Sequence, residues 1–470
     1  MIQKKHIIVA VGVMMVNVVL AQSLNSAYFT DDFKYRHTMN PALDNEKNYV
    51  SIPVLGGINV RTQGNFGYDG VVMNNPLAGQ AGQKSMTTFM NPYISHQTAM
   101  DGFNNGNNRI VGNVSVALLS AGFHEFGGYN TVELNSKSSI GAMLPYELFE
   151  FARNTGNRTY DIGDISAGAL SYLELAFGHS RQISEKIRLG AKLKVLLGVG
   201  RADVALEGIR ADLADANRWF VSGTAKTDVS LKGFKYIEEI KDYKDDSRGT
   251  YRKVNDVDVP NFGIGGLGLA FDVGGVCKLN DQWTLSAALL DLGFISWSND
   301  FQAQNMEDGF VFGGFHDASV SSDRPGQNGT FEQQGNGYLD QITDFINVQD
   351  QGDQGSRTTG IGATFNAGVE YTLSSYDKLK FGLLSSTRLN GEYSWTEARL
   401  SANWNPLEWL NGGMNLAMGS FGASMGWILN IHPKGYNFFI GMDHILGKVS
   451  KEGIPLSSNA GVSVGMNIAW

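Results

Sequence analysis

Two serines of the sequence lie in the pattern G-x-S-x-G, in which a serine on a sharp turn between a strand and a helix acts as a nucleophile. They are Ser424 and Ser463. Ser463 lies within a run in which apolar and small residues alternate, and Ser424 begins another such run. We therefore predict strand positions for both serines, and no nucleophile. Ser180 directly follows His179, but neighbouring residues of a strand point to opposite faces, so this histidine cannot serve as its base.

A glycine-rich stretch at 263–268 fits the pattern G-x-G-x-x-G of dinucleotide-binding folds. That pattern binds a cofactor only where a strand precedes it and a helix opens at it. Here a strand-like run continues to Cys277 instead. Cys277 is the only cysteine, which excludes an internal disulfide and a cysteine-based zinc site. The sequence therefore predicts no enzyme activity, no cofactor and no metal site.

Charged residues inside the alternating runs are the best candidates for a functional site. Apolar residues flank them at every second position, so the two-residue period of a strand places the charges on the opposite face. Inside a channel they would set its selectivity. The alternative is a lumen filled by mutually paired charges that block it. The candidates are Glu174, Arg188, Lys192, Lys194, Glu370 and Arg388.

The segment 298–359 carries ten acidic residues and only two arginines. Carboxylate oxygens suit Ca²⁺, and such a loop could bind divalent cations between lipopolysaccharide phosphates. The regular spacing of a calcium-binding loop is absent, however. The favoured interpretation is a solvated, flexible loop, and its length is typical of a segment that is either functional or disordered.

The elements that must position these charges are runs with strict two-residue alternation. The last run places five apolar residues on one face, with glycine, serine, asparagine and alanine on the other. Similar runs cover 187–199 and 361–373. Each is longer than the five or six residues usual in soluble sheets, and tilted membrane strands need about 9 to 11. The five apolar residues of the last run are Val462, Val464, Met466, Ile468 and Trp470.

We predict an all-β fold, a 14-stranded antiparallel transmembrane β-barrel with long extracellular loops, because bacterial single-chain barrels have even strand numbers. The predicted strands cover 50–62, 109–121, 129–143, 171–182, 186–200, 262–278, 283–297, 360–373, 377–389, 393–404, 411–419, 424–432, 437–446 and 459–470. With the last residue in the periplasm, the long connections 63–108, 144–170, 201–261 and 298–359 all fall on the outer side, as in outer-membrane barrels.

The N-terminus has the pattern of an export signal. Lys4 and Lys5 precede an apolar stretch at 7–20, and Ala21 offers a cleavage point. The stretch is too short for a spanning helix, which needs about 20 residues. We therefore predict a cleaved signal peptide at 1–21 and location in the cell outer membrane. The net charge of −9 disfavours nucleic acid as a partner, and the absence of a linker-like stretch predicts one barrel domain at 49–470.

The alternating run that ends on Trp470 resembles the C-terminal signal that the barrel-assembly machinery reads in outer-membrane proteins. Near the N-terminus, the stretch that contains Asn40, Pro41 and Ala42 resembles the Asn-Pro-Ala element of FadL- and PorV-like barrels. Together with the stretches at 50–59, 118–123, 144–149 and 173–181, these residues make the chain similar to an uncharacterised outer-membrane barrel family of Bacteroidota.

The resemblance implies a 14-stranded barrel whose N-terminal segment, 22–48, acts as a plug. The leading hypothesis is therefore a channel or binding protein for a small molecule. Because FadL-like barrels take up hydrophobic molecules, the resemblance implies a hydrophobic one. PorV-like barrels imply the alternative, a scaffold or shuttle for exported or surface proteins, and a membrane hydrolase is a minor alternative. The expected partners are outer-membrane lipid, lipopolysaccharide, the assembly machinery, and a small ligand or surface protein. No lipid-binding pocket can be matched residue by residue, so the cargo stays open.

Overall fold

The computed structural model describes residues 24–80, 82, 84–215, 218–316, 329–445 and 459–470 of the protein. Its main sheet closes into a ring with 14 strand positions, two of which are each shared by a pair of short strands. In ring order these are β1 (Tyr49–Ser51) with β2 (Ile58–Gly64), β5 (Asn107–Glu125), β6 (Gly128–Pro145), β7 (Thr159–Gln182), β8 (Ile187–Asp215), β12 (Gly266–Lys278), β13 (Trp283–Trp297), β17 (Arg357–Gly360) with β18 (Ala363–Thr372), β19 (Leu379–Leu389), β20 (Trp395–Leu407), β21 (Leu410–Gly419), β22 (Gly422–Ile431), β23 (Gly435–His444) and β24 (Ala460–Ala469).

The ring is closed by the last strand. β24 pairs with β23 on one side and with both β1 and β2 on the other, in antiparallel register. Tyr49 lies opposite Ala469, and Ile58 lies opposite Val464. Neighbouring strands around the ring are likewise antiparallel throughout the described residues. The prediction of an all-β, 14-stranded antiparallel barrel is confirmed.

The two faces of the wall differ as the alternation predicts. On β12, Leu267 and Leu269 are 61% and 51% exposed, while their neighbours Ala270 and Asp272 are each 1% exposed. The outer face therefore carries a band of exposed apolar side chains, which a soluble protein rarely shows over such an area. On β24 the same face presents Met466, which is 41% exposed. The side chains that β24 exposes are those predicted to face lipid. The role of this strand as an assembly signal stays a prediction.

One predicted strand, 50–62, is interrupted. β1 ends at Ser51 and β2 begins at Ile58. Pro53 has no N–H to donate to a neighbouring strand, so it is disfavoured inside a paired strand. Val54, the next residue, adopts a left-handed conformation with φ of 66°, which turns the chain out of the sheet before pairing resumes.

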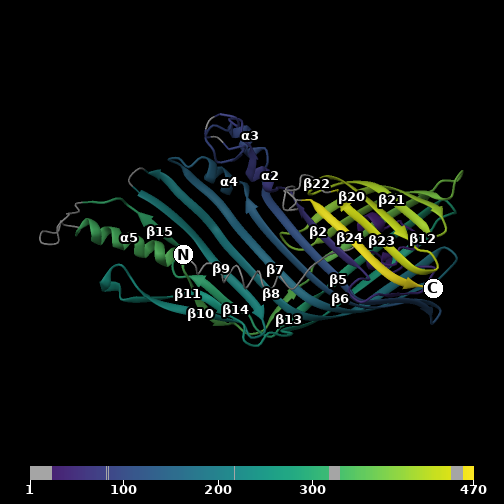
Figure 1. Ribbon diagram of the computed structural model, residues 1–470. Helices are drawn as coiled ribbons and strands as arrows, with labels where there is room; N and C mark the ends of the chain where they lie inside the picture. The colour runs from purple at the N-terminus through teal and green to yellow at the C-terminus, as the bar shows by residue number, and fades with distance from the viewer. Residues whose placement is uncertain (1–23, 81, 83, 216–217, 317–328, 446–458) are drawn as a thin grey trace.

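Short elements cover the end of the barrel where the long connections lie (Figure 1). The helices are α2 (Tyr68–Val71), α3 (His96–Met100), α4 (Tyr146–Arg153) and α5 (Phe331–Ile346), and β3 (Val72–Asn74) pairs with β4 (Met86–Thr88). Across the described residues, every helix is too short or too polar to cross a membrane.

The predicted loops 201–261 and 298–359 are largely ordered. β8 continues to Asp215, and Figure 1 shows β7, β8 and β9 running far past the ends of β20 to β24. We call the protruding ends of β7 and β8, together with the elements that pair with them or pack on them, the outer extension. These further elements are β9 (Arg218–Leu231), β10 (Lys235–Asp242), β11 (Thr250–Asp258), β14 (Phe301–Asn305), β15 (Gly309–Phe312), α5 and β16 (Val348–Asp353). A small apolar cluster of Ala202, Val229, Leu231 and Phe234 holds the β10–β11 hairpin to the sheet.

Two acidic residues of the supposed solvated loop are structural. Asp340 accepts hydrogen bonds from the backbone N–H groups of Lys244 and Asp245. Asp344 accepts from the Tyr243 hydroxyl at 2.6 Å and pairs with Arg248 at 2.7 Å. Burial, together with the hydrogen bond to this carboxylate, raises the pKa of Tyr243 to about 12, so the hydroxyl keeps its proton. The prediction of a flexible loop is wrong for this part of 298–359, because its carboxylates are used to join α5 to the hairpin.

The described residues contain no group of three His, Cys, Asp or Glu side chains arranged to hold a metal ion. The suggested binding of divalent cations therefore finds no support in the ordered part of the acidic segment. Asp317 and Asp323, two further acids of this segment, lie outside the described residues.

We predict that Asp344→Asn loosens the tip of the β10–β11 hairpin. The substitution removes the charge that Arg248 pairs with and weakens a charge-assisted hydrogen bond, which together contribute about 1–3 kcal/mol. Trypsin should then cut after Lys244 and Arg248 faster than in the wild-type protein. The control is Glu332→Gln, which removes an exposed acid from the same helix. Equal cleavage rates in all three proteins would contradict the assigned role of Asp344.

Candidate functional site

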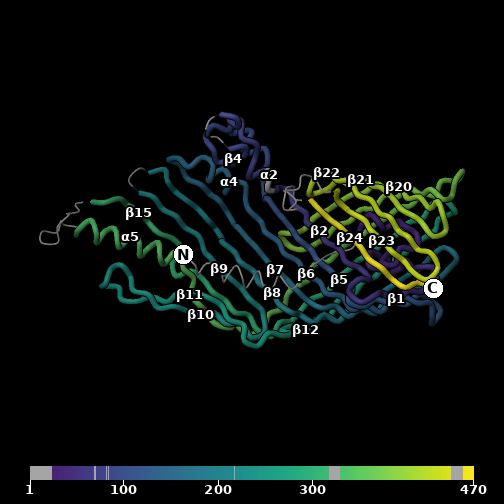
Figure 2. Tube along the Cα trace, in the orientation of Figure 1, coloured from purple at the N-terminus to yellow at the C-terminus, as the bar shows by residue number. Residues whose placement is uncertain are grey.

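The N-terminal segment, residues 24–48, lies within the barrel. Figure 2 shows it in purple inside the ring of yellow and green strands. Its two short turns are η1 (Asn25–Ala27) and η2 (Arg36–Thr38). Asp443 of β23 accepts hydrogen bonds from the backbone N–H groups of Asn25 and Ser26, at 3.0 and 2.7 Å. An inward-facing side chain of the wall thus holds the first turn of the segment that was predicted as a plug.

This segment occupies the end of the lumen where the short turns lie. Asp44 pairs with Arg188 at 2.8 Å, next to the turn between β7 and β8. Asn45 donates to the Tyr129 hydroxyl at 3.1 Å, close to the β5–β6 turn. On the opposite side, Lys380 pairs with Asp31 at 2.8 Å. Contacts to turns around the ring place the segment across the lumen at this end.

The Asn-Pro-Ala element sits against β12 and β13. The Asn40 side-chain amide donates to the backbone carbonyls of Gly275 and Ala287, each at 3.3 Å, while its oxygen accepts from the N–H of Ala42 at 2.9 Å. A Cβ atom at Gly274 would clash with the Asn40 amide, and one at Gly190 would clash with the Pro41 carbonyl group. Two glycines of the wall therefore form the seat of this element, and we call this contact the glycine seat.

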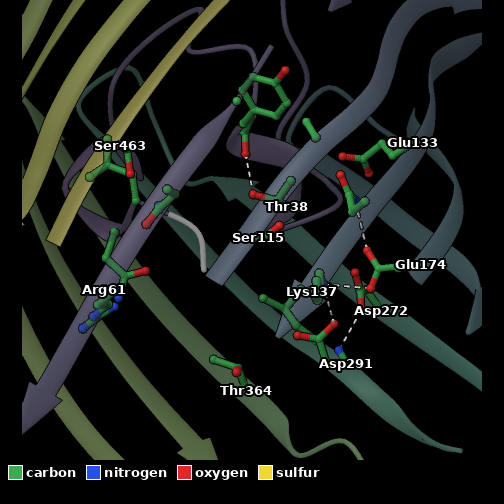
Figure 3. A pocket seen from close by; sticks show the side chains of 18 of the residues that line it. Thr38, Arg61, Ser115, Glu133, Lys137, Glu174, Asp272, Asp291, Thr364 and Ser463 are labelled. Carbon is green, nitrogen blue, oxygen red and sulfur yellow. Dashed lines mark hydrogen bonds and ion pairs between the residues drawn. The ribbon is translucent and has the colours of Figure 1, made fainter. Parts of the chain in front are cut away.

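The largest group of buried charges surrounds Lys194. Its ammonium lies 2.6 Å from Asp291, 2.7 Å from Asp272 and 3.8 Å from Glu174. Lys137 joins the group, at 2.7 Å from Glu174 and 3.4 Å from Asp291. Figure 3 shows Lys137, Glu174, Asp272 and Asp291 gathered on one wall of a cavity. Buried charges persist only when they are paired and hydrogen-bonded, and here each carboxylate has at least one ammonium partner.

The other predicted lumen residues are also paired. Lys192 lies 2.5 Å from Glu133 and 2.8 Å from the His37 ring. Glu370 lies 3.6 Å from Lys380. Arg388 donates to the Thr364 hydroxyl and the Ile361 carbonyl and lies 3.8 Å from Asp291.

The structure therefore points all six predicted side chains into the lumen. It brings Glu174, Lys194 and Arg388 together around Asp291. Arg188 and Lys192 instead contact the N-terminal segment, and Glu370 pairs with Lys380 beside it.

A second group of charges lies on the opposite side of the lumen. Arg61 lies 3.3 Å from Glu397 and 3.5 Å from Asp443. Arg399 lies 2.8 Å from Glu397 and also reaches Asp443 at 3.8 Å. Because Asp443 also caps the first turn of the N-terminal segment, this group fixes that segment to β2, β20 and β23.

Asp291 reaches the lumen through a β-bulge. The register between β12 and β13 shifts between Phe271 and Val273. Asp291 adopts a left-handed conformation with φ of 57°, and its N–H donates to Asp272 at 2.7 Å. On either side of the bulge, Leu290 is 4% exposed and Leu292 is 41% exposed. Strict alternation would turn Asp291 toward lipid, and the extra residue of the bulge turns it inward.

A row of cavities runs through the outer half of the lumen. The outermost, about 540 Å³, is lined by Arg201, Asp203, Glu392 and Tyr393 among others. The next two, about 40 and 30 Å³, share Ser139 and Leu170. The innermost, about 120 Å³, shares Lys137 and Asp291 with its neighbour. Consecutive cavities thus have walls in common, from the outer extension down to the N-terminal segment.

The serine and glycine motifs lie where the alternation places them. Ser463 is within β24 and Ser424 is within β22. The stretch 263–268 leads into β12, without a helix. Ser180 lies 3.5 Å from Arg188, while the His179 ring bonds to Asn130. These serines and this histidine have the strand environments predicted for them, and the absence of enzyme activity stays a prediction.

Sequence reasoning missed several members of the buried groups. The same alternation that identified Lys194 also points Glu133, Lys137 and Asp272 inward, so those three could have been found. Asp291 could not, because only the bulge turns it from the lipid side to the lumen. Arg61 could have been found as well, because the inward parity of Ser51 continues to Arg61 across the interruption at Pro53.

A family model described as "Family of unknown function (DUF5723)" matches residues 41–443. A search of curated proteins finds no match. The Ralstonia pickettii toluene transporter TbuX aligns over 94% of each chain with 9% identity and a TM-score of 0.39. The Pseudomonas putida toluene transporter TodX aligns over 96% of this chain and 94% of its own, with 9% identity and a TM-score of 0.38. A Pseudomonas aeruginosa FadL homologue aligns over 96% and 98%, with 11% identity and a TM-score of 0.36. Likenesses this distant carry no argument about ligands.

We predict that Gly274→Ala displaces the Asn-Pro-Ala element from the glycine seat, because the added methyl group meets the Asn40 amide and the Pro41 ring. Overpacking of this kind costs about 1–3 kcal/mol. The N-terminal segment should then become accessible to protease in the detergent-solubilised barrel. The matched control is Gly275→Ala, whose methyl group would meet the end of the flexible Leu189 side chain at 3.3 Å and the Arg188 carbonyl oxygen at an ordinary contact distance of 3.8 Å. Identical protease patterns for both variants would show that the seat does not hold the segment.

Proposed function

The chain belongs to the family of unknown function DUF5723, and we propose that it is an outer-membrane channel or binding protein that takes a small amphipathic molecule into its lumen. The closed ring of antiparallel strands and its band of exposed apolar side chains support a place in the membrane. Residues 1–21, the predicted export signal, lie outside the described residues. The Bacteroidota origin likewise stays a prediction.

The row of cavities is the observation that carries the proposal. It begins in a cavity of about 540 Å³ beside the outer extension and ends in one of about 120 Å³ beside the N-terminal segment. A barrel that served only as a membrane anchor would not need such a row. The side chains along it come from β6, β7, β8, β13 and β19, so it is built by the wall itself and not by one loop.

The innermost cavity indicates the class of ligand. Its lining combines apolar side chains, among them Leu24, Phe33 and Leu290, with the charged side chains of Lys137 and Asp291. Its volume of about 120 Å³ is similar to the roughly 150 Å³ of a cavity that holds a benzene ring. A molecule with one ring or a short chain and one polar group fits such a mixed lining. This ligand is more polar than the hydrophobic cargo that the FadL resemblance implies.

The N-terminal segment crosses the lumen beyond this cavity. A ligand that enters from the outer side is therefore expected to bind at this cavity, on the outer side of the segment. Passage to the other side requires the segment to move. The glycine seat and the Asp443 contacts are the interactions that such a movement would break.

The outer extension favours a second candidate function, a scaffold for a surface protein. Helix α5 exposes Phe331, Leu339 and Ile346, which are 53%, 50% and 64% accessible. Exposed apolar side chains on an ordered helix are typical of binding surfaces. Cross-linking in intact cells, followed by purification in mild detergent, tests this candidate. Recovery of the barrel alone would count against it.

We predict that Leu290→Trp abolishes ligand entry, because the larger side chain fills the innermost cavity. Influx into proteoliposomes of two permanently charged ring solutes, benzenesulfonate and benzyltrimethylammonium, measures the effect. At least one solute should enter faster than into protein-free vesicles, and Leu290→Trp should slow it about tenfold or more by excluding it from the cavity.

Leu292→Trp is the matched control. Leu292 lies two residues away but faces outward, where an indole ring is tolerated beside lipid. Influx through this variant should equal that of the wild-type protein. If neither solute enters faster through the wild-type barrel, and mass spectrometry finds no co-purified small molecule, the proposed function is wrong.

A further inference from the structure

We propose that Asp291 and Arg388 form a gate that selects small organic anions, beside the smallest cavity of the row. The inference rests on the proposed function and adds the charge of the ligand to it. This cavity measures about 30 Å³, enough for roughly two water molecules. That space accommodates one carboxylate or sulfonate group, and a larger part of a solute passes only if the surrounding side chains move.

Arg388 is the cation beside this cavity that has the weakest acidic contact. Lys137 and Arg388 line the cavity together with Asp291, and Lys137 is held by both Glu174 and Asp291. Farther inward, Glu174 is already paired with Lys137, and Asp272 is paired with Lys194. Among the described residues, Asp291 is therefore the one acidic side chain that Arg388 reaches.

The two oxygens of Asp291 have different partners. Oδ1 lies 2.6 Å from Lys194 and 3.4 Å from Lys137, while Oδ2 faces Arg388 at 3.8 Å. The last distance is longer than a hydrogen bond, so the pair with Arg388 is the weakest contact of this carboxylate. An incoming anion can take the place of Oδ2 beside Arg388 and leave the two lysine contacts intact.

The backbone at Asp291 supports a functional origin for this arrangement. Positive φ is uncommon outside glycine, although aspartate is among the residues that adopt it, and bulges in strands often re-aim a side chain next to a site. The bulge places a negative charge at the centre of three cations from β6, β8 and β19. Asp291 thus acts as a resident anion that a solute anion has to displace.

Two substitutions should change the selectivity in opposite directions. Arg388→Gln removes the cation that receives the solute, so the influx ratio of benzenesulfonate to benzyltrimethylammonium should fall about tenfold. Asp291→Asn removes the resident anion and should raise the same ratio about tenfold. Asparagine tolerates the left-handed backbone, and Lys194 and Lys137 keep Asp272 and Glu174 as partners, so this variant should fold.

The matched controls are Arg181→Gln and Asp281→Asn, two exposed residues near the short turns that lie outside the cavity row. Neither should change the ratio. An unchanged ratio in both gate variants, or a fall in Asp291→Asn, would overturn the inference while leaving the channel itself in place.

If the wild-type barrel admits neither solute, the barrel is not a channel for them, and equilibrium binding decides the inference separately. Calorimetric titration of the detergent-solubilised barrel with benzenesulfonate should show binding that weakens in Arg388→Gln and tightens in Asp291→Asn. No binding to the wild-type protein, or equal affinity in all variants, would overturn the anion gate.

Discussion

The constraint on which this structure depends is that lipid offers no hydrogen-bond partners to a backbone. Every N–H and C=O group of a membrane-spanning strand must therefore find a partner in a neighbouring strand. The sheet meets this demand only by closing, and β24 supplies the closure by pairing with β23 on one side and with β1 and β2 on the other. Closure then sends every second side chain inward, which fixes what the lumen contains.

A ring of 14 strands is wider than inward side chains alone can fill, since about eight strands is the limit for that. The N-terminal segment and the ion pairs fill the remainder. Glycines make this possible, because positions such as Gly190 and Gly274 let the segment's backbone approach the wall. The lining of the inner cavity thus comes from two sources, the N-terminal segment and the barrel strands.

The place where the period fails also borders the smallest cavity of the row. A single bulge beside Asp272 turns Asp291 from the lipid side to the lumen, among Lys137, Lys194 and Arg388. The two-residue period alone would have left this carboxylate on the lipid side, away from the three cations. The bulge residue is therefore the one to which we assign the preference of the lumen for anions.

The sequence alone determined the ring. Alternation and turn positions gave the number of strands, their direction and the inward side of Glu174, Lys192 and Lys194, because a period of two is a local property of the chain. Tertiary structure alone decided which charges meet. The bulge at Asp291, the seat of Asn40 against Gly274, and the use of Asp344 to join α5 to a distant hairpin all depend on contacts between residues far apart in the sequence, and no local pattern encodes such contacts.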